Sequence, residues 1–130
     1  MDTKSKIRIA VVDDNAVNRN SFKQKISQFA DIELVLNVDS GHYFLESIKG
    51  LPLQLMPQVV FMDIEMPGLN GIETIKLSKP IHEEMHFVVL TVFEDDENIF
   101  DAIQAGASGY LLKHESDQTI YNAIIENSLI

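Results

Sequence analysis

Four short apolar runs in this chain each end on a polar residue that can take part in chemistry. The runs, with the residues that follow them, are 9–12 with Asp13 and Asp14, 59–62 with Asp63, 87–90 with Thr91, and 110–112 with Lys113. Apolar runs of this length, rich in Val and Ile, are typical of strands buried on both faces. Stretches with helical patterning lie between them, which predicts that the strands run parallel.

The complete pattern predicts five strand–helix units. The expected strands cover residues 7–12, 32–38, 59–62, 87–91 and 109–112. The first expected helix covers 17–29, with Phe22, Ile26 and Phe29 on its buried face. The second is capped by Asp39 or Ser40 and lined by Tyr43, Phe44 and Ile48. The third covers 72–78, the fourth starts at the acidic run 94–97 and ends at a left-handed Gly106, and the fifth covers 116–128. This alternation predicts a doubly wound α/β fold with a five-stranded parallel sheet and right-handed crossovers, in one domain over residues 1–130.

The polar residues at the strand ends should lie close together. Parallel strands direct their carboxyl ends to one edge of the sheet, where ligands of open α/β sheets bind. Adjacent carboxylates at Asp13 and Asp14 repel each other unless a cation lies between them, and Mg²⁺ suits such oxygen ligands. Asp63 adds a third carboxylate that can act as a nucleophile, while Lys113 and Thr91 can bind phosphoryl oxygens. The set predicts a metal-assisted phosphoryl site.

Each of these residues also has a purely structural interpretation. An Asp after a strand is often a helix cap, and a Lys in that place is often solvated. The phosphoryl site is favoured because four strand ends carry complementary groups at once.

Composition narrows the class of protein. With 130 residues, of which 45% are apolar, the chain suits one globular domain. A formal net charge of −10 repels phosphate backbones, so we expect no direct binding to nucleic acid. The lack of cysteine excludes thiolate catalysis and cysteine-bound zinc. Without a signal peptide or an apolar run long enough to span a bilayer, we expect a cytoplasmic protein with no membrane contact.

Over nearly its whole length the chain resembles a response-regulator receiver domain of two-component signalling. The matching features are the acidic pair Asp13 and Asp14, Asp63, the turn Met66-Pro67-Gly68 with Asn70-Gly71, Thr91, and the segment 105–113 that ends on Lys113. The resemblance implies the flavodoxin-like strand order 2-1-3-4-5, with five helices in a three-layer α/β/α arrangement. It is similar in particular to receivers that precede a helix-turn-helix output domain.

The resemblance also implies roles for single residues. Asp63 would accept a phosphoryl group from a phosphohistidine on a histidine kinase or a histidine phosphotransfer protein. Mg²⁺ would be held by Asp14, Asp63 and the backbone carbonyl of Glu65, with Asp13 acting mainly through water. Lys113 and Thr91 would be the catalytic contacts to the phosphoryl group. Thr91 and Tyr110 would then switch the surface of the fourth helix, fifth strand and fifth helix. Such a domain phosphorylates and dephosphorylates only its own aspartate, so it is a signalling domain rather than an enzyme.

Three residues depart from the common receiver pattern. His114 follows Lys113 where many receivers have proline, Val92 follows Thr91 where a smaller residue is common, and Asn70 stands where Asp is frequent. None of these changes removes a reactive group. Because a cis peptide without proline costs about 3–4 kcal/mol, we expect the Lys113–His114 peptide to be trans.

Three other functions fit this sequence less well than the receiver. A phosphatase of the haloacid-dehalogenase type needs two aspartates spaced by one residue and usually a cap insertion, whereas these aspartates are adjacent. A flavodoxin needs a phosphate loop rich in hydroxyl groups and glycine, but residues 13–15 are acidic. A receiver-like module that is never phosphorylated is disfavoured by the intact set of site residues.

The last helix carries a second apolar pair beside its expected core residues. Ile120, Ala123 and Ile124 form the core stripe, and Tyr121 and Ile125 point off it at i, i+4 spacing. An extra apolar strip on a surface helix suggests a partner face. We therefore expect a two-fold homodimer through the fifth helix, at least in the phosphorylated state, although both residues could instead merely flank the core.

Overall fold

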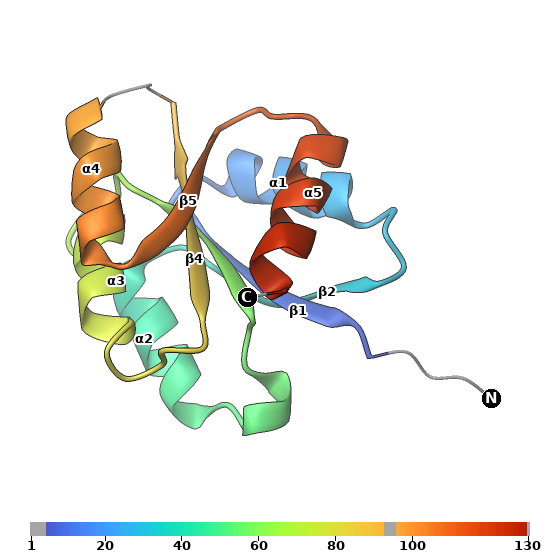
Figure 1. Cartoon of the computed structure of the whole chain (residues 1–130), viewed down its shortest axis with the longest axis horizontal. Helices are drawn as coiled ribbons and strands as arrows, with labels where there is room; N and C mark the ends of the chain where they lie inside the picture. Colours follow the sequence, from blue (N-terminus) through green and yellow to red (C-terminus); the bar gives the residue numbers. More distant parts are fainter. Residues whose placement is uncertain (1–4, 93–95, 130) are drawn as a thin grey trace.

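The computed structural model describes residues 5–92 and 96–129 as a five-stranded sheet with helices on both faces (Figure 1). The strands are β1 (Ile7–Val12), β2 (Ile32–Val38), β3 (Val59–Asp63), β4 (His86–Thr91) and β5 (Ala107–Leu112). Their order in the sheet is β2-β1-β3-β4-β5, and every neighbouring pair is parallel. The expected fold class and strand order are confirmed.

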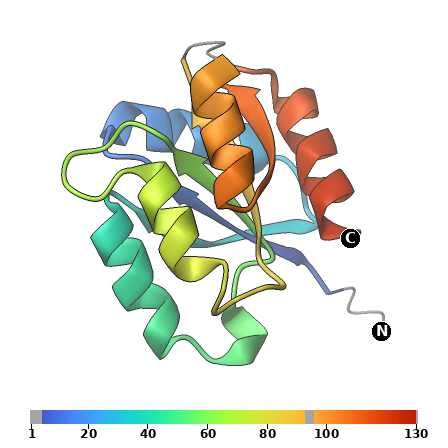
Figure 2. The ribbon, with the colours of Figure 1, turned by 60° about the vertical axis from the view of Figure 1, so that its left-hand side comes forward.

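The helices cover the two faces of the sheet unequally (Figures 1 and 2). The helices α1 (Ala16–Ile26) and α5 (Asp117–Ser128) lie on one face, and α2 (Gly41–Gly50), α3 (Gly71–Ser78) and α4 (Asp96–Ala105) lie on the other. A short 3₁₀ helix, η1 (Leu53–Leu55), follows α2. Among the described residues, no helix combines the length and apolar character that a membrane span requires.

Alternation along the central strands separates two clusters of buried side chains. In β1, Ile9 and Val11 pack toward α1 and α5, whereas Ala10 and Val12 pack toward α2, α3 and α4. Because both faces are covered, the central strands are apolar at almost every position, which explains the continuous runs in the sequence.

Side-chain caps fix where α2, α3 and α5 begin. The Ser40 hydroxyl accepts from the Tyr43 N–H before α2, and the Ser116 hydroxyl accepts from the Thr119 N–H before α5. Asn70 and Glu73 form a reciprocal capping box at the start of α3. The cap before α2, for which Asp39 and Ser40 were both candidates, is therefore Ser40.

Two side chains expected on buried helix faces lie elsewhere. The helix α1 ends at Ile26, so Phe29 lies in the following turn, where its N–H donates to the Ile26 carbonyl at 3.0 Å. There its ring packs on Tyr121 with centroids 4.4 Å apart. Tyr43 is 61% exposed, since Phe44 and Ile48 already fill the face of α2 that meets the sheet.

The region of α4 confirms one expectation, and another lies partly outside the described residues. Gly106 ends this helix with a φ of 120°, a left-handed conformation that glycine adopts more readily than any residue with a side chain. Asp96 and Glu97 lie in the first turn of α4, as expected for acidic residues there. The earlier half of the acidic run, 94–95, falls among the residues that are not described.

Candidate functional site

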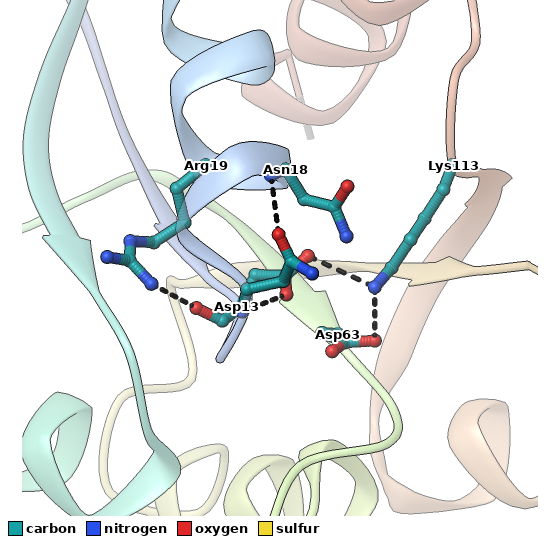
Figure 3. Close-up of polar contacts among 6 residues, drawn as sticks. Asp13, Asn18, Arg19, Asp63 and Lys113 are labelled. Carbon is teal, nitrogen blue, oxygen red and sulfur yellow. Dashed lines mark hydrogen bonds and ion pairs between the residues drawn. The ribbon is translucent and has the colours of Figure 1, made fainter.

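The polar residues predicted at the strand ends meet at the carboxyl edge of the sheet. Asp13 follows β1, Asp63 is the last residue of β3, Thr91 is the last of β4, and Lys113 follows β5. The ammonium of Lys113 lies between two carboxylates, with its Nζ 3.1 Å from Asp13 Oδ2 and 3.1 Å from Asp63 Oδ1 (Figure 3). The structure therefore brings these groups to one place, as expected from a parallel sheet.

A cavity of about 160 Å³ opens beside these groups. Its walls include Asp14, Asp63, Glu65, Thr91 and Lys113. Most of these wall residues carry charges or hydroxyl groups, so the cavity suits a small charged ligand rather than an apolar one.

Asp13 is held from several sides by the turn between β1 and α1. It is only 1% exposed, its N–H donates to the Val38 carbonyl at 3.1 Å, and its Oδ1 accepts from the Asn15 N–H at 2.9 Å. Asn15 in turn caps α1, because its side-chain oxygen accepts from the Asn18 N–H at 3.0 Å. The next residue, Asp14, is exposed to the cavity. The turn thus fixes one carboxylate and presents the other.

Three carboxylates form a donor set that fits a divalent cation. Asp13, Asp14 and Asp63 each offer one oxygen, and these oxygens lie within 4.8 Å of one another. Carboxylate oxygens are the ligands that Mg²⁺ prefers, and a cation would relieve the repulsion between them. The residues present are therefore suited to hold Mg²⁺.

The carboxyl group of Asp63 has an unusual affinity for protons. Burial and the nearby charges of Asp13 and Asp14 raise its pKa from 3.8 to about 7, although Lys113 partly opposes this shift. In the metal-free protein, the Asp63 carboxyl group therefore gains or loses its proton near neutral pH.

This shift has a consequence for the stability of the metal-free protein. Because folding raises the pKa of Asp63, the folded state retains a proton that the unfolded chain loses between pH 3.8 and about 7. This group therefore lowers the free energy of unfolding as the pH rises through that interval. We expect Asp63→Asn to be more stable than the unmodified protein at about pH 8 in urea, with a smaller difference at about pH 5. A difference that grows toward low pH would contradict the shift.

Lys113 stays charged at this site. Burial disfavours its ammonium, but the hydrogen bonds and negative charges of Asp63 and Asp13 outweigh burial and raise the pKa of Lys113 above 10.5. Its backbone N–H donates to the Thr91 carbonyl at 2.7 Å, which ties the end of β5 to the end of β4. The Lys113–His114 peptide is trans, as expected, and His114 follows with a left-handed φ of 74°.

Gly71 lets α3 start directly against the backbone of Asp63. A Cβ at Gly71 would lie 2.1 Å from the carbonyl oxygen of Asp63, so any side chain there must displace backbone. We expect Gly71→Ala to lower the free energy of unfolding by about 2 kcal/mol, as overpacking commonly does. Urea denaturation would measure it, with Gly50→Ala as the control because nothing lies within 4 Å of a Cβ there. Equal stability of the two variants would contradict the close approach.

Tyr110 and Arg19 differ in their relation to this site. Tyr110, expected to act in the switch, is 43% exposed on β5 and is not among the residues that line this cavity. Arg19 was not anticipated from the sequence, yet its Nη1 donates to the backbone carbonyl of Asp13 at 2.8 Å (Figure 3). Its position one turn into α1 carries no periodic or motif signal that would have identified this contact.

Comparison with known proteins agrees with this geometry. Residues 9–125 match the family of the response regulator receiver domain. The chain is 36% identical over 121 residues to YxjL, a transcriptional regulatory protein of Bacillus subtilis, covering 93% of this chain and 54% of the relative. It is 30% identical over 124 residues to NarL, a nitrate/nitrite response regulator protein of Escherichia coli, covering 95% of this chain and 56% of the relative. The chain thus spans about half the length of these relatives.

Solved structures show the same likeness over the whole fold. The signal receiver domain of a NarL response regulator from Mycobacterium tuberculosis has a TM-score of 0.88 at 25% identity, covering 97% of this chain and 98% of that one. The response regulator domain of CheB from Thermotoga maritima has a TM-score of 0.82 at 26% identity, covering 96% and 98%. With its family match, its strand order and its clustered strand ends in agreement, the chain belongs to the receiver domains of two-component response regulators.

Proposed function

We propose that Asp63 is the phosphoacceptor of this receiver domain and takes its phosphoryl group from a phosphohistidine on a histidine kinase or a histidine phosphotransfer protein. The observation that supports this most is the pairing of a buried carboxylate with the Lys113 ammonium at 3.1 Å, beside a polar cavity. Such a pairing offers a nucleophile and a cation for phosphoryl oxygens in one place.

The proposed reaction uses few groups. A carboxylate oxygen of Asp63 attacks the phosphorus, the bond from phosphorus to the imidazole nitrogen breaks, and its electron pair leaves with the imidazole, which takes up a proton from water. Lys113 shifts its ammonium to a phosphoryl oxygen, and the Thr91 hydroxyl donates to another. Attack by water on the acyl phosphate later releases inorganic phosphate and restores the carboxylate. The domain thereby limits the lifetime of its own signal.

The acidic cluster is assigned to Mg²⁺ in this proposal. Asp14, Asp63 and the backbone carbonyl of Glu65 would hold the ion, with Asp13 acting mainly through water. When bound, the ion supplies charge neutralisation for the phosphoryl oxygens. The proposed location is the cytoplasm, where kinase, Mg²⁺ and a reducing environment are found together.

Labelling with a small phosphodonor tests the proposed function. Acetyl phosphate should phosphorylate the protein in the presence of Mg²⁺, and chelation of the metal should suppress the reaction. The acyl phosphate should be lost in mild base, unlike a phosphate ester. A protein that is folded but not labelled would instead be a receiver-like interaction module, and the proposal would be wrong.

The proposed output is a change in the surface formed by α4, β5 and α5. Thr91 would move toward the phosphoryl group and Tyr110, now 43% exposed, would turn inward behind it. The surface would then be read by a further part of the protein or by a partner, as the names of transcriptional regulators among the relatives suggest.

A homodimer through α5 is also proposed, with one change to its expected contacts. The Tyr121 hydroxyl donates to Asp31 Oδ2 at 2.6 Å and its ring packs on Phe29, so this side chain already serves the fold. Ile125 is the partly exposed apolar residue that remains for a partner.

Replacing Ile125 tests this dimer without disturbing Tyr121. We expect the protein to dimerise with beryllofluoride, a mimic of the phosphoryl group, and Ile125→Lys to remain monomeric because a charge would be buried without a partner. Mass in solution is the measurement. Glu46→Lys on α2, at the opposite face of the sheet, is the control and should dimerise normally. Dimerisation of Ile125→Lys, or a monomeric parent protein, would rule out this interface.

A further inference from the structure

We propose that Arg19 is a positioning residue for phosphoryl transfer, which holds the turn carrying Asp13 and Asp14 in the shape that binds the metal ion. The contact is the hydrogen bond of 2.8 Å from Arg19 Nη1 to the carbonyl oxygen of Asp13 (Figure 3). The inference rests on the proposed function, since it concerns the same site.

The carbonyl of Asp13 belongs to the peptide that joins the two acidic residues. Any rotation of this peptide would swing Asp14 relative to Asp13 and change the spacing of their carboxylates. The N–H of Asp13 is fixed from β2 by the Val38 carbonyl at 3.1 Å, and its Oδ1 is fixed by the Asn15 N–H at 2.9 Å. Arg19 fixes the remaining side of this residue from α1. Asp13 is therefore anchored from β2 through its N–H, while Arg19 on α1 holds the carbonyl of the peptide that joins Asp13 to Asp14.

Arg19 and Lys113 differ in whether they contact the carboxylate oxygens that a cation needs. Lys113 pairs with carboxylate oxygens of Asp13 and Asp63 and so shares the atoms that a cation needs. Arg19 approaches from the other side and uses a main-chain carbonyl (Figure 3). It therefore places a positive charge beside three clustered carboxylates without occupying any carboxylate oxygen.

The chain offers a matched control for this contact. Arg8 and Arg19 are its two arginines. Arg8 lies near the amino-terminal end of β1, away from the acidic cluster at the carboxyl end. It also donates to a main-chain carbonyl, with its Nε 2.8 Å from the oxygen of Met56. A purely structural contribution of such a bond should be visible equally in both variants, whereas an effect on the metal site should be confined to Arg19.

The first measurement is the affinity for Mg²⁺ by calorimetry. We expect Arg19→Met to bind Mg²⁺ about fivefold more weakly, the equilibrium equivalent of the roughly 1 kcal/mol that one hydrogen bond contributes. Arg19→Lys, which keeps the charge and one donor group, should recover part of the affinity, and Arg8→Met should bind like the unmodified protein. A role through charge alone predicts the reverse, because removing a cation would tighten Mg²⁺ binding. Tighter binding by Arg19→Met, or equal weakening by Arg8→Met, would overturn the proposal.

The second measurement needs neither metal nor phosphodonor. Hydrogen exchange of the Asn15 amide, which bonds Asp13 Oδ1, should be about fivefold faster in metal-free Arg19→Met and unchanged in Arg8→Met. Unchanged exchange in Arg19→Met would refute the positioning role even if the protein is phosphorylated as proposed. Conversely, failure of acetyl phosphate labelling would refute the proposed function, but the exchange rates of Arg19→Met and Arg8→Met would still test whether Arg19 positions the turn. If Arg19→Met does not fold, Arg19→Lys against Arg8→Lys provides the same test.

Discussion

Asp63→Asn should not be phosphorylated by acetyl phosphate in the presence of Mg²⁺. The amide is a far weaker nucleophile than the carboxylate. In the described part of the chain, no other carboxylate both pairs with Lys113 and lines the cavity. We expect labelling to fall below about one hundredth of the level of the unmodified protein, since covalent catalysis has lost its acceptor. Radioactive or intact-mass measurement of the incubated protein would show it.

The matched control is an exposed aspartate outside the site. Asp101 lies exposed on α4, so Asp101→Asn should be labelled as fully as the unmodified protein. Substantial labelling of Asp63→Asn would mean that another carboxylate, such as Asp14, accepts the phosphoryl group.

Lys113→Met should destabilise the metal-free protein and make it respond more strongly to Mg²⁺. The substitution leaves Asp13 and Asp63, which are 1% and 3% exposed, without the ammonium that bridges them. Breaking a buried ion pair by removing one partner typically costs about 3–5 kcal/mol. The loss should lie toward the lower end, because Asp63, with its pKa raised to about 7, can take up a proton instead.

Thermal or urea unfolding with and without Mg²⁺ measures this prediction. In the variant no ammonium competes for the carboxylates, so the ion should recover more stability than it adds to the unmodified protein. Lys25→Met is the control, because Lys25 donates to the Glu115 carbonyl at 2.9 Å rather than to the acidic cluster. A Lys113→Met variant as stable as its parent, or one indifferent to Mg²⁺, would contradict the bridging geometry.

The sheet and the reactive strand ends could be predicted because they depend on short-range patterns. A strand covered on both faces must be apolar throughout, so Asp13, Asp63 and Thr91 stand out where each run stops. Parallel strands then bring these residues to one edge. The strand order followed from the resemblance to receivers, since hydrophobic periodicity does not distinguish which strands are neighbours.

Contacts between distant side chains could not be predicted in this way. Helical periodicity placed Tyr121 beside the core stripe of α5, but its partners Asp31 and Phe29 lie in the turn before β2. Arg19 on α1 reaches back to a main-chain carbonyl, and no periodicity encodes such a contact. Tyr43 fits a helical apolar pattern, yet Phe44 and Ile48 are the large side chains of α2 that are buried against the sheet, and Tyr43 is 61% exposed.

The most direct test of the central claim is to locate the phosphoryl group on the unmodified protein. After incubation with acetyl phosphate and Mg²⁺, borohydride reduces an acyl phosphate to an alcohol, and peptide mass spectrometry then identifies the residue changed. The account predicts reduction at residue 63 alone. Reduction at residue 13 or 14, or no reduced residue in a protein shown to be folded, would contradict it.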